Sequence, residues 1–230
     1  MYYYGIDWTY IVFVVPAIIF TFIAQFWVKS AYSKMSRTFS THGYTGAQVA
    51  KAILDSAGVY GVSIVPIGGE MTDNFNPSTN TVSLSSGVYD STSIAAAGIA
   101  AHECGHAIQY AKGYGPIKLR NSIIPLCNIG STLSMPLFII GLIFNFEALL
   151  YAGIALFALA VLFQLITLPV EFNASRRAMA ALRDRGLLTS DELPKARRVL
   201  TAAAMTYVAA LSVSLMQLLR LIVLANRRRD

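Results

Sequence analysis

The chain has 230 residues, of which 55% are hydrophobic and only 13% are charged, and its formal net charge is +6. This composition excludes an ordinary soluble domain and indicates a membrane protein. Two cysteines are too few for a disulfide scaffold, and the basic residues come without any nucleic-acid-binding motif.

The first apolar segment runs from Tyr10 to Val28, close to the roughly 20 residues that a helix needs to cross a bilayer. It has no positively charged start and no small-residue cleavage site, so we interpret it as an uncleaved anchor. Asp7 precedes it, and Lys29 and Lys34 follow it. The positive-inside rule therefore places the N-terminus outside and residues from about 30 to 120 in the cytoplasm.

A short strand is predicted at residues 81–85, where polar and apolar side chains alternate. Turns are expected beside it, at Gly68-Gly69 and from Asn74 to Asn80. As an edge strand just before the next helix, it would hold an extended peptide by main-chain hydrogen bonds. A plain hairpin strand fits the same pattern.

The run His102-Glu103-Cys104-Gly105-His106 is the most informative stretch of the chain. It lies in a predicted helix from Ile94 to Tyr110, which places residues i and i+4 one above the other. His102 and His106 can therefore offer nitrogens to one metal ion. Glu103 then sits beside the metal, where its carboxylate can take a proton from an attacking water. This HExxH pattern is a zinc-protease signature and predicts one catalytic Zn²⁺.

A catalytic zinc ion of this type needs a third protein ligand. Lys112 stands six residues after His106, which excludes a third histidine at that spacing, so the ligand is His42 or an acid. Cys104 points to another side of the helix and is expected to be a small buried residue.

The next two apolar segments, residues 123–146 and 148–170, form a hairpin that leaves the cytoplasmic face and returns to it. Glu171 follows at once and is predicted as the third ligand, with the Ser175 hydroxyl one helical turn later to support it. A juxtamembrane glutamate paired with Arg176 or Arg177 is the alternative.

A weaker apolar segment runs from Leu200 to Val223, after a basic stretch that indicates a cytoplasmic location for residues 171–199. We interpret it as a fourth span, although its basic tail would then lie outside, and a helix packed on the catalytic core is the alternative. Tyr207 in this segment is the candidate donor for the oxyanion of hydrolysis. Arg176, Arg177 and His42 are its rivals.

The chain resembles the YugP-type neutral zinc metallopeptidases of bacterial membranes over nearly its whole length. The resemblance rests on AAHECGHAIQYAKGYGPIKLR, VEFNASRRA, TDNFNPSTNTVSLSSGVYDSTSIAAAGIAAHE and TAAAMTYVAAL. It implies a multi-pass metallopeptidase of the bacterial cell membrane, more distantly similar to HtpX-type gluzincins, in which a downstream glutamate is the third ligand. Glu171 matches that glutamate, whereas Ser175 stands where the HtpX-like pattern usually has an aspartate.

Together these patterns predict a single membrane-embedded domain over residues 1–230. It is mainly α, with three to four transmembrane helices and a small α+β zincin-like catalytic unit in the cytoplasm. The expected activity is zinc-dependent hydrolysis of peptide bonds in membrane or membrane-proximal proteins, with the lipid bilayer as a further partner and no nucleic acid. The alternatives are an intramembrane protease and a zinc-stabilised scaffold or partner subunit without turnover.

Overall fold

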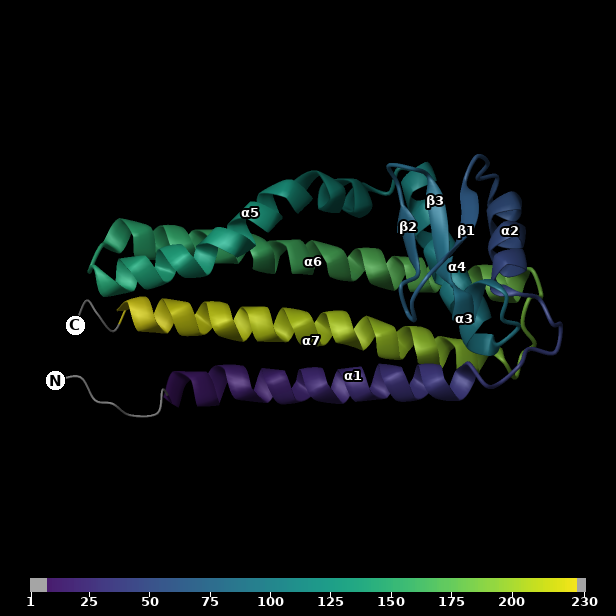
Figure 1. Ribbon diagram of the computed structural model, residues 1–230, viewed down its shortest axis with the longest axis horizontal. Coiled ribbons are helices and arrows are strands. Elements are labelled where there is room, and N and C mark those ends of the chain that lie inside the picture. The colour runs from purple at the N-terminus through teal and green to yellow at the C-terminus, as the bar shows by residue number, and fades with distance from the viewer. Residues whose placement is uncertain (1–7, 227–230) are drawn as a thin grey trace. The chain divides into compact units, whose positions relative to one another are not determined.

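The computed structural model describes residues 8–226 and contains long helices together with one small sheet (Figure 1). The chain divides into two compact units. The helical unit comprises Met1–Gln25, Leu119–Leu168 and Thr206–Asp230, and the sheet unit comprises Phe26–Lys118 and Pro169–Met205. The predicted class, a mainly α membrane protein with a small α+β unit, is confirmed. The prediction of one domain over the whole chain stays a prediction.

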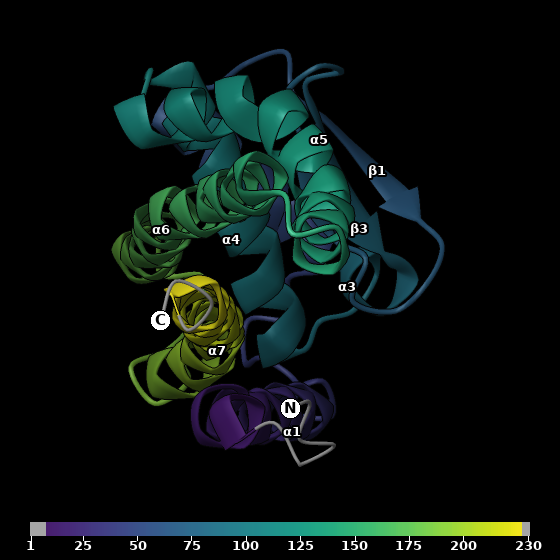
Figure 2. The ribbon, with the colours of Figure 1, turned by 90° about the vertical axis from the view of Figure 1, so that its left-hand side faces the viewer.

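The long helices are apolar enough to cross a membrane, and the four predicted spans lie in them, except that the second was predicted to residue 146 and its helix ends at Ile143. A π-helical turn, Tyr10–Val14, leads into α1 (Val15–Met35), and the others are α5 (Gly115–Ile143), α6 (Glu147–Asp184) and α7 (Leu193–Asn226). Within the helical unit α7 lies between α6 and α1 (Figures 1 and 2). There the Gln164 amide of α6 donates to the Ser214 hydroxyl of α7 at 2.9 Å. The cation of Arg220 on α7 lies 5.2 Å from the Tyr10 ring centre.

The α6 helix is longer than the membrane span predicted within it. The predicted span ends at residue 170, but the helix continues through Pro169 to Asp184. Proline is tolerated in long apolar helices because neighbouring groups satisfy the carbonyl that it leaves free. Glu171 therefore stands on the same continuous helix as the third span.

The sheet has three strands in the order β1-β3-β2. β1 (Ser63–Ile67) pairs parallel with β3 (Thr81–Ser85), and β2 (Asn74–Asn76) pairs antiparallel with it. The predicted strand at residues 81–85 is confirmed, but the expectation of an edge strand was wrong, because both edges of β3 are paired. Residues 74–76, expected in a turn, form the strand beside it. β2 has only three residues, two of them asparagine, so its sequence shows no alternation of polar and apolar side chains from which a strand could be predicted.

Three helices accompany the sheet: α2 (Gly46–Ala57), α3 (Ser86–Tyr89) and α4 (Ile94–Ala111). The predicted motif helix is confirmed as α4. It begins at the Ser93 hydroxyl, which accepts from the Ala96 amide at 3.1 Å, and Gly113 follows its end with a φ of +66°.

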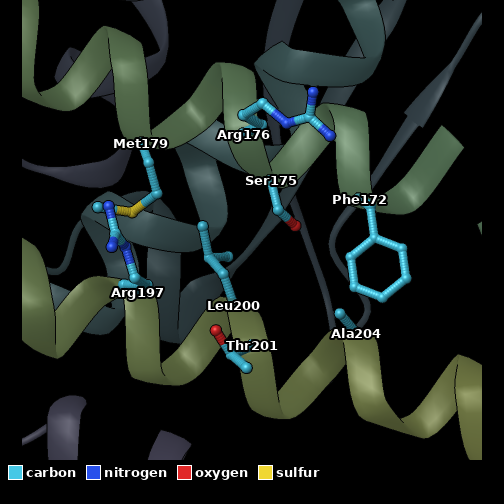
Figure 3. A pocket seen from close by; sticks show the side chains of 8 residues that line it. All are labelled: Phe172, Ser175, Arg176, Met179, Arg197, Leu200, Thr201 and Ala204. Atoms are coloured by element: carbon cyan, nitrogen blue, oxygen red, sulfur yellow. The ribbon is translucent and has the colours of Figure 1, made fainter. Parts of the chain in front are cut away.

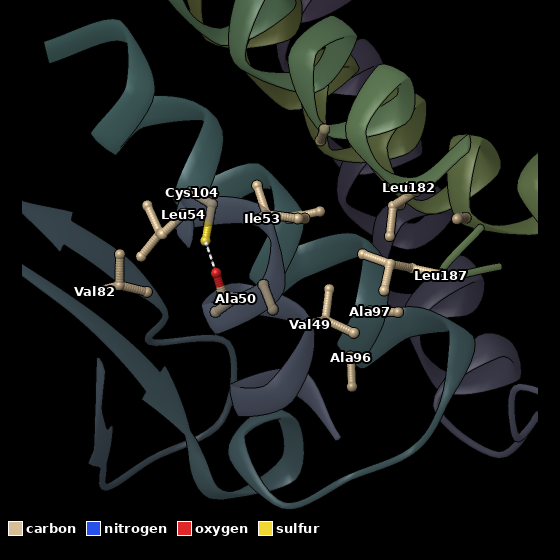
Figure 4. Packing of buried hydrophobic residues seen from close by; sticks show 14 of the residues in the cluster. Val49, Ala50, Ile53, Leu54, Val82, Ala96, Ala97, Cys104, Leu182 and Leu187 are labelled. Atoms are coloured by element: carbon tan, nitrogen blue, oxygen red, sulfur yellow. Dashed lines mark hydrogen bonds between the residues drawn. The ribbon is translucent and has the colours of Figure 1, made fainter. Parts of the chain in front are cut away.

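Most of α4 is buried in the core of the sheet unit, against α2 and the sheet (Figure 4). Cys104 belongs to that core and is fully buried, as expected, with its sulfur 3.5 Å from the Ala50 carbonyl oxygen of α2. Burial raises the pKa of the Cys104 thiol. The thiol therefore stays neutral and faces α2.

Candidate metal centre

The two motif histidines of α4 and Glu171 of α6 come together in the sheet unit. Their potential ligand atoms all lie within 4.8 Å of one another. His102 Nε2 is 3.2 Å from His106 Nε2, and Glu171 Oε2 is 3.2 Å from the first of these nitrogens and 3.5 Å from the second. Among residues 8–226, no other group of three His, Cys, Asp or Glu side chains brings its ligand atoms this close together.

The chemistry and spacing of these atoms fit zinc. Zinc binds imidazole nitrogen and carboxylate oxygen at roughly 2.0–2.2 Å in a tetrahedron, so two ligand atoms on one ion lie about 3.3 Å apart. The three separations of 3.2, 3.2 and 3.5 Å agree with that value. A tetrahedron made by three protein ligands leaves a fourth position for water or substrate, which is the arrangement of a catalytic rather than a structural site.

A glycine brings the two helices close enough for this cluster. A Cβ atom added at Gly105 would lie 2.7 Å from the Ala174 carbonyl oxygen, too close for any side chain. Because Gly105 stands one residue before His106 and Ala174 three residues after Glu171, this approach of α4 and α6 occurs beside the ligands. Glu171 is only 2% exposed as a result.

Gln109 fixes the orientation of His106. Its amide nitrogen donates to the Val170 carbonyl at 2.8 Å and to the Asn173 side-chain oxygen at 3.0 Å. The amide oxygen therefore faces His106 Nδ1, at 3.1 Å, and that nitrogen must carry the hydrogen. The lone pair of His106 Nε2 is then free to face a metal ion. In metal sites generally, a hydrogen bond from the other ring nitrogen fixes the histidine in this way.

His102 is held in a similar way by Ser175, whose hydroxyl oxygen lies 3.1 Å from His102 Nδ1. The sequence predicted a supporting role for Ser175 but assigned it to Glu171 rather than to the histidine. Gln109 and Asn173 were missed altogether. The signal for Gln109 was its position three residues after His106, on the same face of the helix.

Glu103 is buried, with 8% of its surface exposed, and stands beside the first ligand. Burial raises the pKa of the Glu103 carboxyl; the imidazoles of His102 and His106 lower it, and the nearby carboxylates add to the rise. Asp73 is one of these carboxylates, and it accepts from the Ser85 amide at 2.7 Å. The net result is a raised pKa, which makes Glu103 a better proton acceptor.

Burial lowers the pKa of His106, but the hydrogen bond with Glu171 and the negative charge of Glu103 outweigh burial and raise it. The cluster thus provides a negative environment around two imidazoles. Such an environment favours a cation between them.

The other candidates from the sequence lie elsewhere. His42 is exposed, its ring 6.3 Å from that of Tyr44, and it does not join the cluster. Arg177 donates to the Asn173 side chain at 2.7 Å, and Arg176 is exposed. Tyr207 lies on α7 in the helical unit, 38% exposed, and its role as an oxyanion donor stays a prediction.

Comparisons with known proteins identify the family of this chain. A family model described as "Putative neutral zinc metallopeptidase" matches residues 10–226. The chain is 43% identical over 221 residues to "Putative membrane protease YugP" of Bacillus subtilis (strain 168), an alignment that covers 96% of this chain and 98% of that protein. No solved structure matches significantly. On the family match and this identity, the chain belongs to the family of neutral zinc metallopeptidases.

Proposed function

We propose that this protein is a membrane-bound zinc endopeptidase in which His102, His106 and Glu171 hold one catalytic ion and Glu103 is the general base. The observation that carries the proposal is the convergence of three ligand atoms within 4.8 Å. The Nδ1 atoms of both histidines are occupied by Ser175 and Gln109, so both Nε2 atoms are left for the metal. A structural zinc ion would not need the buried carboxylate of Glu103 beside it.

Zinc bound by these residues would polarise the carbonyl of the scissile peptide and lower the pKa of water. Glu103 accepts the proton of the attacking water and delivers it to the leaving amine, a role that its burial and raised pKa favour. Tyr207 is the proposed donor to the oxyanion. Tyr207→Phe is expected to lower turnover while zinc content is unchanged, and an unchanged rate removes this role.

Because β3 is the central strand, we propose that a substrate forms main-chain hydrogen bonds with the outer edge of β2 instead. β2 is paired with β3 on one side, and α4 packs against β2. An extended peptide added along this edge would keep its side chains free of the sheet, which suits a protease that accepts many sequences.

The site is proposed to work on the cytoplasmic side of a multi-pass protein. Basic residues follow the first and third predicted spans and precede the second and fourth in the sequence, and four spans would place both chain ends outside. The motif helix α4 is not among the candidate spans of the described chain, which argues against an intramembrane location of the motif. Substrates are therefore expected to be membrane-attached or membrane-proximal proteins.

The test is cleavage of casein by the detergent-purified protein, with zinc content measured on the same samples. Glu103→Gln is expected to keep zinc and to lose at least about a hundredfold in rate, the contribution typical of a general base. The exposed Glu70→Gln is the matched control and should cleave like the wild type. A Glu103→Gln protein that still cleaves contradicts the mechanism. A wild type that binds zinc but cleaves no protein in a panel supports the scaffold instead.

A further inference from the structure

A pocket of about 210 Å³ lies between α6 and α7 in the sheet unit (Figure 3). The zinc-ligand candidates do not line it, so it is separate from the metal centre. It comes close to that centre at one point, because Ser175 lines the pocket and also bonds His102 Nδ1.

The pocket combines an apolar wall with two cations. Side chains such as Phe172, Met179 and Leu200 supply most of its lining. Arg176 and Arg197 lie at it as well, one from each helix, and both are exposed. In the part of the chain that the structure describes, neither of these two arginines makes a hydrogen bond or an ion pair. Their charges are therefore available to an anionic ligand.

The residues that line the pocket are arranged in order along the axes of α6 and α7. Figure 3 shows Phe172 beside Ala204 at one end of the pocket and Met179 beside Arg197 at the other. Phe172 comes two residues after the third predicted span, and Ala204 lies within the fourth. Met179 is two helical turns beyond Phe172, about 10 Å at 1.5 Å per residue. Phe172 and Ala204 thus form the end that is nearer to the spans along α6 and α7, and Arg197 stands at the opposite end. Arg176 lies between them, with its guanidinium turned toward Phe172.

We propose that this pocket binds one anionic glycerophospholipid of the cytoplasmic leaflet. The phosphate lies against Arg197, the glycerol beside the Ser175 and Thr201 hydroxyls, and the acyl chains leave past Phe172. Arg176, whose guanidinium lies on the other side of Ser175 in Figure 3, adds a second positive charge near the headgroup. Basic pockets between helices at the cytoplasmic surface bind anionic lipid headgroups in this manner. The proposal rests on the membrane spans proposed above but not on peptide cleavage.

The experiment is native mass spectrometry of the full-length protein in detergent, titrated with phosphatidylglycerol. The wild type is expected to bind one lipid saturably. The double variant Arg176→Gln/Arg197→Gln should bind at least about tenfold more weakly, because two cations near the headgroup are lost. The matched control, Lys195→Gln/Arg198→Gln, removes two exposed cations of α7 outside the pocket. It should stay within about twofold of the wild type.

A third variant separates the pocket from its charges. Thr201→Phe fills the pocket from an exposed position without altering the net charge. It should also weaken lipid binding. If the arginine variant does not fold, this variant tests whether the pocket binds the lipid. Equal losses in both double variants would mean general electrostatic attraction and would overturn the proposal. So would equal binding of phosphatidylcholine, or displacement of the lipid by millimolar inorganic phosphate, which would identify a soluble phosphate ligand.

Discussion

Two hydrogen bonds to the motif histidines determine which of their nitrogens are left for a metal ion. Ser175 and Gln109 occupy the Nδ1 atoms of His102 and His106. The sequence indicated Ser175 because it stands one turn after Glu171, but the register between α4 and α6 decides which group it touches. That register is set by long-range packing and cannot be read from spacing along one helix.

Loss of either partner is expected to weaken zinc binding. Ser175→Ala and Gln109→Met should each lower zinc affinity by about 10- to 100-fold, because the ring they orient becomes free to turn or to change tautomer. Competition with a chromophoric chelator measures this affinity. Ser36→Ala, which removes a hydroxyl bonded to the Ser33 carbonyl at the end of α1, is the control and should leave the affinity unchanged. An unaltered affinity in both site variants would contradict the orienting role.

At the scale of elements, the contact between α4 and α6 depends on Gly105. Gly105→Ala places a methyl group 2.7 Å from the Ala174 carbonyl oxygen, so α6 must move and carry Glu171 with it. We expect a loss of about 1–3 kcal/mol in stability, the usual effect of overpacking, together with a lower zinc content. Thermal unfolding and metal analysis of the purified protein measure both.

Gly98 on the same helix provides the matched control. A Cβ atom there would lie 3.7 Å from the Ala196 Cβ, an ordinary van der Waals contact. Gly98→Ala should therefore be neutral or stabilising by up to about 1 kcal/mol, since alanine favours a helix more than glycine does. Equal behaviour of the two variants would show that close helix packing at Gly105 does not matter.

The start of α7 is tied to the loop before α2 by Glu192. This carboxylate is 5% exposed and accepts from the Thr41 amide at 2.7 Å, the Thr41 hydroxyl at 2.8 Å and the Thr189 amide at 2.9 Å. Burial raises the pKa of Glu192, but these hydrogen bonds outweigh burial and lower it. Because the pKa of Glu192 is lower in the folded than in the unfolded state, its carboxylate stabilises the fold at pH values above the unfolded pKa. This stabilisation is lost as the pH falls through the folded pKa.

Glu192→Gln is therefore expected to be less stable than the wild type at pH 7, by about 1–3 kcal/mol for hydrogen bonds to a charged group. The difference should shrink as the pH falls below about 4.5, where the unfolded chain binds a proton that the folded carboxylate, with its lowered pKa, does not yet hold. Melting temperatures between pH 7 and pH 3 test this, with the exposed Asp191→Asn as the control. A difference that is constant with pH would show that charge plays no part.

At the scale of the whole molecule, the sequence predicted what depends on long apolar runs and on a local motif. The four apolar helices and the motif helix lie where they were expected, because each of the four contains a long apolar run and the motif helix has its own capping serine. The order of the strands was not predictable, since β2 has three residues and exists through its pairing with β3. The length of α6 was not predictable either, since the apolar run defines only the span to residue 170 and the helix continues to Asp184.

Four spans would place both ends of the protein outside. An alkaline phosphatase fused to the C-terminus should therefore be active, and a green fluorescent protein at the same position should be dark. A fusion within residues 185–192, between α6 and α7, is the control and should show the opposite pattern. A fluorescent C-terminal fusion would mean that α7 does not cross and that the protein has three spans.

The measurement that tests the metal centre most directly is the zinc content of the purified wild type, Glu171→Gln and His42→Gln. The proposed centre predicts about one zinc ion per chain in the wild type and in His42→Gln, and much less in Glu171→Gln, which loses one of three ligands. Full zinc retention by Glu171→Gln together with its loss from His42→Gln would contradict the assignment and make His42 the third ligand.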